Sequence, residues 1–181
     1  MREALRLGGR LLVIALVAGL ALGATYFVTK EPIAQQTLLA AQEARSRVFP
    51  GAFEQDKQTG LTGNIQALYA SAEQQGYILE VKASGYGGSF LVTVGVTSQG
   101  EIRGVVVGDN NETPGLGKNA QKESFTAQFA GKNQQITVKK GGGAGEAEVD
   151  ALTGATITSQ AVTDAVNEAR DFVRKLGGMA S

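Results

Sequence analysis

Three short loops rich in small residues carry the side chains best suited to chemistry. They read SGYGG at residues 84–88, ETPGLG at residues 112–117 and DALTGATITS at residues 150–159. Each loop alone fits an ordinary turn or helix cap, since Gly permits positive φ angles, Pro-Gly marks turns and Thr caps helices. Three such loops in one modest domain indicate more, because omitting side chains lets the backbone approach a flat ligand closely. The sequence therefore predicts a ligand site built from these loops.

The third loop indicates how a ligand would be held. Gly154 and Ala155 leave the Thr156 hydroxyl with little steric cover, and a helix expected from about Ser159 would direct free N–H groups toward it. A phosphate ester on Thr156 would be well placed there. The same spacing fits a plain N-cap, for which Thr156, Thr158 and Ser159 compete. Spacing alone leaves both interpretations open.

The composition narrows the chemistry further. The chain has neither Cys nor His, which excludes disulfides, thiolate chemistry, His-ligated haem, the usual zinc sites and His-based triads. No metal ligand set is expected. Basic and acidic residues both number 17 in 181 residues and form no basic face, so nucleic acid is not an expected partner. Electron or hydride transfer would need a bound cofactor to supply the reactive atoms.

The elements around the loops predict an α+β domain, an antiparallel sheet covered by helices. Period-two alternation predicts strands at residues 90–96 and 101–107, and turn signals at residues 74–76, 84–88 and 98–100 are spaced for a meander. A short helix at residues 118–130 would present Phe125 and Phe129, a strand is expected at 135–139, and residues 141–145 form a flexible connector.

A last helix is expected at about residues 159–176, ending at Gly177. Its core face would carry Val162, Val166, Ala169, Phe172, Val173 and Leu176.

An uncharged run at residues 11–28 precedes these elements. As a helix its roughly 18 residues would extend about 27 Å, enough to cross a bilayer core. Arg2, Arg6 and Arg10 lie before it, so the positive-inside rule places the N-terminus in the cytoplasm. A cleaved signal peptide and a buried core helix are the alternatives, but the run is longer than a usual signal core and has no polar face.

The predicted organisation therefore has four parts. Residues 1–10 are expected to form a cytoplasmic N-terminus, and residues 11–28 a transmembrane helix. Residues 29–60 are expected to form a connecting helix, which begins after Pro32, and a linker. Residues 61–178 are expected to form an extracytoplasmic domain. The chain is expected to be a single-pass protein of the cell (inner) membrane.

The loop DALTGATITS resembles the flavinylation motif of the FMN-binding domains found in Rnf electron-transport complexes and in the sodium-pumping NADH:quinone reductase. Asp150, Thr153, Gly154, Ala155 and Thr156 match each motif position. The family also carries an ETPGLG segment and a glycine-rich loop like SGYGG. The GYGG form, the short chain and the lack of Trp are more similar to the G subunit of Rnf complexes than to the C subunit of the quinone reductase. Asn110 stands where the family often has His.

The resemblance implies an electron carrier whose covalent FMN is moved onto Thr156 by a flavin transferase. The carrier would serve a complex that couples electron transfer between ferredoxin and NAD to ion translocation, alongside other membrane subunits and the lipid bilayer. It acts as an enzyme only as part of that complex, with no catalytic side chain of its own. The implied FMN-binding residues are Thr156 (covalent), Asp150, Leu152, Thr153, Gly154, Ala155, Thr158, Ser84, Gly85, Tyr86, Gly87, Gly88, Glu112, Thr113, Leu116 and Gly117.

Two alternatives accompany this interpretation. The first keeps the flavin but assigns the chain to the quinone reductase or to another reductase. The second is a membrane-anchored binding or assembly module, which predicts no covalent adduct. Within the implied site, Tyr86, Thr113 and Leu116 are expected to contact the flavin ring, and Asp150 and Thr153 to help the transferase recognise its target.

Overall fold

The computed structural model describes residues 2–55, 60–71 and 76–179, and the chain forms two units, residues 1–42 and 43–181. The first unit is the greater part of helix α1 (Arg2–Val48). Its apolar residues 11–28 are exposed, and by length and composition α1 is the only helix among the described residues able to cross a membrane. The prediction that a new helix begins after Pro32 is wrong, since Pro32 lies inside α1. A proline withholds a single N–H from the helix, which the helix can accommodate.

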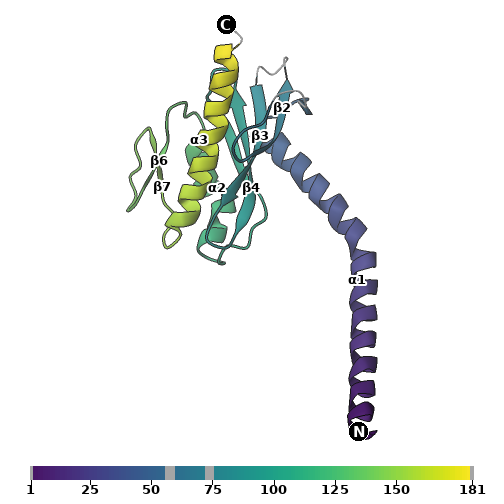
Figure 1. Cartoon of the computed structure of the whole chain (residues 1–181). Helices are drawn as coiled ribbons and strands as arrows, with labels where there is room; N and C mark the ends of the chain where they lie inside the picture. Colours follow the sequence, from purple (N-terminus) through teal and green to yellow (C-terminus); the bar gives the residue numbers. More distant parts are fainter. Residues whose placement is uncertain (1, 56–59, 72–75, 180–181) are drawn as a thin grey trace. The chain divides into compact units, whose positions relative to one another are not determined.

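A five-stranded antiparallel sheet forms the frame of the second unit (Figure 1). Neighbouring strands follow one another in sequence order, which confirms the predicted meander. The predicted turn at residues 98–100 lies between the fourth and fifth strands, whereas the turn predicted at residues 74–76 falls mostly outside the described residues. The strands are β1 (Glu54–Gln55), β2 (Ile65–Ser71), β3 (Gly76–Ser84), β4 (Ser89–Thr97) and β5 (Ile102–Val107).

Helix α3 (Thr156–Met179) packs its apolar side on one face of the sheet (Figure 1). The predicted core positions Val162 to Val173 are buried and Leu176 is partly buried, which confirms the predicted helix face. The helix begins earlier than expected, at Thr156. It also continues past Gly177, so the predicted stop is wrong; glycine permits a left-handed turn without requiring one.

The other face of the sheet is covered by the C-terminal end of α1. Val48 and Phe49 are buried against Ile78 of β3, and Phe53, Tyr69 and Val106 pack around them. Both faces of the central strands are therefore buried, which explains why Thr93 and Gly95 of β4 lie inside as well as the alternating Val residues. The strand alternation predicted one buried face and missed the second.

The segment after β5 forms three short helical turns instead of one helix. These are η1 (Gly117–Gln121), α2 (Glu123–Thr126) and η2 (Ala127–Phe129). Phe125 and Phe129 are buried as predicted, with ring centroids 5.5 Å apart in an edge-to-face arrangement. Their packing in the core holds the segment against β5.

A small parallel pair, β6 (Thr137–Lys139) and β7 (Glu148–Asp150), completes the second unit. The strand at β6 was predicted and the strand at β7 was not. Parallel strands normally need a long crossover, and here the connection turns tightly because Gly141, Gly142 and Gly143 all have positive φ angles of 90°, 83° and 74°. The connector predicted at residues 141–145 thus lies in the turn between β6 and β7, which leads to Asp150.

Candidate functional site

The SGYGG loop is the tight hairpin that joins β3 to β4. The Gly85 N–H donates to the Gly88 carbonyl over 3.0 Å, and Gly88 has a φ of 120°, so the turn depends on glycine there. A Cβ on Gly87 would lie 2.2 Å from the backbone oxygen of Asn111. The loop therefore packs directly against the segment that leads into ETPGLG, and the large side chain of Tyr86 remains 77% exposed.

The ETPGLG loop follows β5 and folds back into η1. Gly115 has a φ of 80°, and the N–H groups of Leu116 and Lys118 donate to the Thr113 carbonyl over 3.1 and 3.2 Å. This turn exposes Leu116 and buries Glu112, which is only 4% exposed. Asn110 is buried beside it; its Oδ1 accepts the Glu112 N–H (3.2 Å) and its Nδ2 donates to the Gly108 carbonyl (3.1 Å). Asn110 therefore supports the start of the loop through the backbone.

The DALTGATITS loop joins β7 to α3. Gly154 has a φ of 73°, and the Ala155 N–H donates to the Leu152 carbonyl over 3.0 Å. The Ser159 hydroxyl accepts the Leu152 N–H (2.9 Å) and donates to the Ala155 carbonyl (3.0 Å). Ser159 therefore closes the loop from within the first turn of α3 and does not act as the N-cap.

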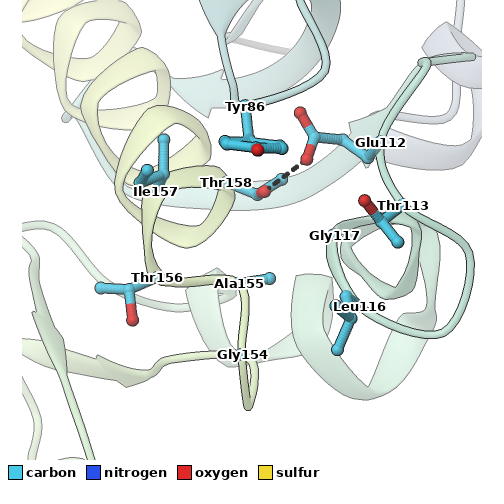
Figure 2. A pocket seen from close by; sticks show the side chains of 10 residues that line it. All are labelled: Tyr86, Glu112, Thr113, Leu116, Gly117, Gly154, Ala155, Thr156, Ile157 and Thr158. Carbon is cyan, nitrogen blue, oxygen red and sulfur yellow. Dashed lines mark hydrogen bonds between the residues drawn. The ribbon is translucent and has the colours of Figure 1, made fainter.

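Thr156 and Thr158 have different surroundings in that first turn. Thr158 is only 1% exposed, and its hydroxyl donates to Glu112 Oε2 over 2.7 Å. Thr156 is partly exposed, and its hydroxyl has no hydrogen-bond partner among the described residues. Figure 2 shows Thr158 directed toward Glu112 and Thr156 directed away from it. Of these two hydroxyls, only that of Thr156 is free to react.

The three loops enclose one pocket of about 560 Å³, a size within the usual range of small-molecule sites (Figure 2). Exposed apolar side chains gather at this pocket. Outside α1, four large hydrophobic side chains are exposed among the described residues, and three of the four are Tyr86, Leu116 and Ile157. Exposed apolar groups gathered at a cavity mark a binding surface. The lining residues are Tyr86, Glu112, Thr113, Leu116, Gly117, Gly154, Ala155, Thr156, Ile157 and Thr158.

Nine of the residues expected to bind a cofactor line this pocket, namely all of those just given except Ile157. Ile157 was missed because its spacing puts it off the core face of α3; an apolar side chain at such a position was the available signal. Ser84, Gly85, Gly87 and Gly88 lie in the hairpin behind Tyr86 and do not line the pocket. Leu152 and Thr153 precede it, with the Thr153 side chain exposed and without a partner among the described residues.

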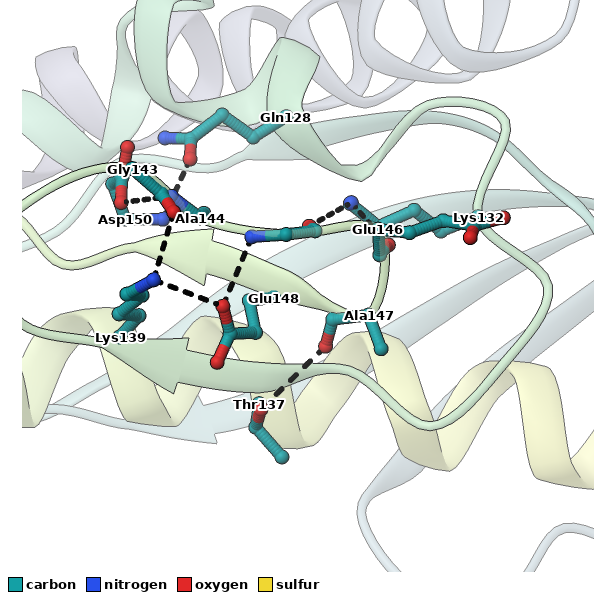
Figure 3. A network of polar contacts seen from close by, with 11 residues as sticks. Gln128, Lys132, Thr137, Lys139, Gly143, Ala144, Glu146, Ala147, Glu148 and Asp150 are labelled. Atoms are coloured by element: carbon teal, nitrogen blue, oxygen red, sulfur yellow. Dashed lines mark hydrogen bonds and ion pairs between the residues drawn. The ribbon is translucent and has the colours of Figure 1, made fainter.

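Asp150 faces the glycine connector and does not line the pocket. Its Oδ1 accepts the Ala144 N–H over 2.9 Å, and its own N–H donates to Gln128 Oε1 over 2.7 Å (Figure 3). In the same network Glu148 Oε2 accepts the Gly145 N–H (2.9 Å) and lies 3.4 Å from Lys139 Nζ. The Gly145 hydrogen bond, aided by Lys139, holds the pKa of Glu148 below its ordinary value. Asp150 therefore connects the start of the DALTGATITS loop to the glycine connector and to Gln128.

Comparison with known proteins agrees with the site. The model of the FMN-binding domain family matches residues 85–171, a range that contains most of all three loops. The chain is 31% identical to the G subunit of the proton-translocating ferredoxin:NAD(+) oxidoreductase complex of Clostridium ljungdahlii, over 93% of this chain and 90% of that protein. It is 33% identical to the G subunit of the Na(+)-translocating ferredoxin:NAD(+) oxidoreductase complex of Acetobacterium woodii, over 90% of this chain and 87% of that protein.

A third relative and a solved structure extend the comparison. The G subunit of the ion-translocating oxidoreductase complex of Methanosarcina acetivorans is 36% identical, over 90% of each chain. The crystal structure of NqrC from Shewanella oneidensis is 22% identical with a TM-score of 0.55, covers 74% of this chain and 72% of its own, and shares the fold. The chain belongs to the FMN-binding domain family and, within it, to the G subunits of ion-translocating oxidoreductase complexes of the Rnf type.

Proposed function

We propose that FMN is joined through its phosphate to the Thr156 hydroxyl, and that its ring occupies the pocket between the three loops. One observation carries this proposal. Among Thr153, Thr156 and Thr158, only Thr156 both lines the pocket and has a hydroxyl without a hydrogen-bond partner among the described residues. Thr153 lies off the pocket, and the Thr158 hydroxyl is committed to Glu112.

The surroundings of Thr156 fit both ends of the cofactor. Thr156 is the first residue of a 24-residue helix, whose free N–H groups and dipole favour a phosphate at that end. Tyr86, Leu116 and Ile157 offer apolar surface for a flat ring, and Thr113 lies among them in the pocket wall. When bound, FMN supplies the ability to take up and release electrons, which none of the side chains provides.

Attachment requires a separate flavin transferase that uses FAD and Mg²⁺. The Thr156 oxygen forms a bond to the FMN phosphorus, the pyrophosphate bond of FAD breaks, AMP leaves and the hydroxyl proton is lost. Thr153, exposed and unpartnered among the described residues, is free to contact the transferase. Asp150 contributes by holding residues 141–145 against the attachment loop.

The loaded protein would pass electrons between neighbouring subunits of a complex that couples ferredoxin and NAD to ion translocation. We place the N-terminus in the cytoplasm, α1 in the lipid bilayer and the FMN domain outside, from the charges of Arg2, Arg6 and Arg10. A covalent tether suits this side of the membrane, because a flavin that dissociated there would be diluted beyond recapture.

In-gel fluorescence after full denaturation tests the attachment. The full chain is coexpressed with a flavin transferase as wild type, Thr156→Ala and the control Thr62→Ala, which changes an exposed threonine off the pocket. We expect fluorescent wild-type and control bands and a dark Thr156→Ala band. A dark wild-type band would refute covalent attachment and favour a non-covalent module, whereas a fluorescent Thr156→Ala band would move the attachment to another residue.

A further inference from the structure

One buried carboxylate holds the three loops together. Glu112 of ETPGLG accepts the Gly87 N–H of SGYGG at Oε1 (2.9 Å) and the Thr158 hydroxyl of DALTGATITS at Oε2 (2.7 Å). Each oxygen thus bonds to a different loop. The bonds join segments 25 and 46 residues away along the chain, so no local turn preference accounts for them.

Two glycines make room for this carboxylate. A Cβ on Gly85 would lie 2.3 Å from Glu112 Oε1, and a Cβ on Gly117 would lie 2.3 Å from Glu112 Oε2 and 2.7 Å from Thr158 Oγ1. Neither glycine has a positive φ angle, so the backbone conformation does not require glycine at either position. Their lack of a side chain is explained by the space that Glu112 occupies.

The Glu112 carboxylate also lines the pocket without a cationic partner. No ion pair among the described residues includes it, although its side chain is almost fully buried. Both of its oxygens accept hydrogen bonds, and both donors are neutral groups. A buried negative charge with only neutral donors acts over longer range than a paired charge in water.

We propose that Glu112 is a positioning residue that assembles the flavin pocket, and that its negative charge lowers the reduction potential of the bound flavin. The inference rests on the proposed function. Reduction adds electrons to the ring, and whenever protons do not follow one for one the ring becomes more negative. A fixed negative charge in the pocket wall disfavours that product.

Spectroelectrochemical titration of the full flavinylated chain tests this inference. Glu112→Gln keeps the shape of the side chain and removes its charge, so we expect the flavin potential to become more positive. The expected change is at least tenfold in the ratio of reduced to oxidised flavin at fixed potential, or about 30 mV for a two-electron couple. Glu123→Gln removes a charge from an exposed site off the pocket and is expected to match wild type.

Thr158 separates the effect of charge from that of loop packing. Thr158→Val removes one donor from the carboxylate and leaves its charge less neutralised, so the potential should shift to a more negative value, opposite to Glu112→Gln. Thr158→Ser keeps the hydroxyl and should match wild type. If Glu112→Gln fails to fold or to accept flavin, the comparison of Thr158→Val with Thr158→Ser still tests the charge effect.

The results that overturn the inference differ from those that overturn the proposed function. An unchanged or more negative potential in Glu112→Gln refutes the charge effect, as does a Thr158→Val potential that is unchanged or more positive. Both results require a wild-type chain that carries flavin after denaturation. A wild-type chain without covalent flavin instead refutes the attachment, and the inference fails with it.

Discussion

Thr156 and Thr158 lie two positions apart at the start of α3, and their hydroxyls have different surroundings. A helix turns by about 100° per residue, so residues two apart face nearly opposite sides. One side meets the buried Glu112, which binds Thr158, and the other side leaves Thr156 unpartnered among the described residues. The direction in which α3 leaves the loop therefore determines which of the two hydroxyls is left unpartnered.

The three motifs predicted which residues gather around the pocket better than they predicted how those residues are held. They put Thr156, Leu116 and Tyr86 together because each belongs to a recognisable linear pattern. They did not give the hydrogen-bond partners of Glu112 or Asp150, since those partners come from other segments and depend on how the loops pack. Contacts between distant segments leave no periodic signal in the sequence.

Gly87 should be intolerant of a methyl group. A Cβ there would meet the backbone oxygen of Asn111 at 2.2 Å and its carbonyl carbon at 2.6 Å, and backbone cannot move aside as a side chain can. We expect Gly87→Ala to reduce the free energy of unfolding by about 1–3 kcal/mol and to lower the fluorescence of the denatured band. Thermal unfolding followed by circular dichroism measures the first effect.

Gly60→Ala provides the control for Gly87→Ala. A Cβ on Gly60 would meet nothing within 4 Å, and its φ angle is not positive, so this variant should match wild type. Equal unfolding temperatures for Gly87→Ala and wild type would contradict the close packing of the SGYGG loop against residues 111–112.

At the scale of elements, the C-terminal end of α1 packs closely on two glycines of the sheet. Gly95 and Gly104 are register partners on β4 and β5, and a Cβ on either would lie 2.7–3.1 Å from backbone atoms of Val48. Arg45 reinforces the contact: Nη1 lies 2.7 Å from Glu80 Oε1 and donates to the Tyr69 hydroxyl over 2.9 Å. Residues 43–49 are thus part of the folded domain.

This contact between α1 and the sheet was only partly predictable from the sequence. In the sequence, Val48 is one apolar residue of a helix, and a glycine within a strand can mark a close backbone approach without identifying the partner. Their meaning depends on a contact between segments that lie about fifty residues apart, which neither local pattern contains. The meander and the face of α3 were predictable because their periodicity is local.

The Arg45–Glu80 contact should contribute measurably to stability. Both side chains are mostly buried, with 21% and 12% exposed, so solvent screens the pair less than a surface pair. A double-mutant cycle with Arg45→Ala and Glu80→Ala should give a coupling free energy of about 1–2 kcal/mol. The exposed pair Arg47 and Glu43 lies at the same 2.7 Å distance and should give less than about 0.5 kcal/mol. Equal coupling free energies for the two pairs would contradict a buried contact between α1 and the sheet.

The connector between β6 and β7 should loosen in acid. The folded-state pKa of Glu148 is lowered chiefly by the Gly145 N–H and also by Lys139, so its contribution is complete above the ordinary glutamate pKa. That contribution is lost as the pH falls through the lowered folded pKa. Amide hydrogen exchange at Gly145, corrected for intrinsic rates, should therefore lose protection in this acidic window in wild type.

Two variants isolate the carboxylate responsible. Glu148→Gln should leave Gly145 weakly protected at every pH, because the charge that strengthens the bond is absent. Glu146→Gln removes an exposed neighbouring carboxylate and should keep the wild-type pH dependence. A wild-type profile in Glu148→Gln would assign the acid effect to another group.

At the scale of the whole molecule, the absence of cysteine makes the topology directly measurable. The chain contains no Cys, so a single introduced thiol is the only target for a maleimide reagent. Glu3 lies at the N-terminal end of α1, and Gln99 lies exposed in the turn between β4 and β5. Because Arg2, Arg6 and Arg10 predict a cytoplasmic N-terminus, we expect a membrane-impermeant maleimide on intact spheroplasts to label Gln99→Cys and spare Glu3→Cys. Both variants should react after lysis, which controls for burial of the thiol. Labelling of Glu3→Cys alone would reverse the orientation, and labelling of both would indicate that the chain is not held across an intact membrane.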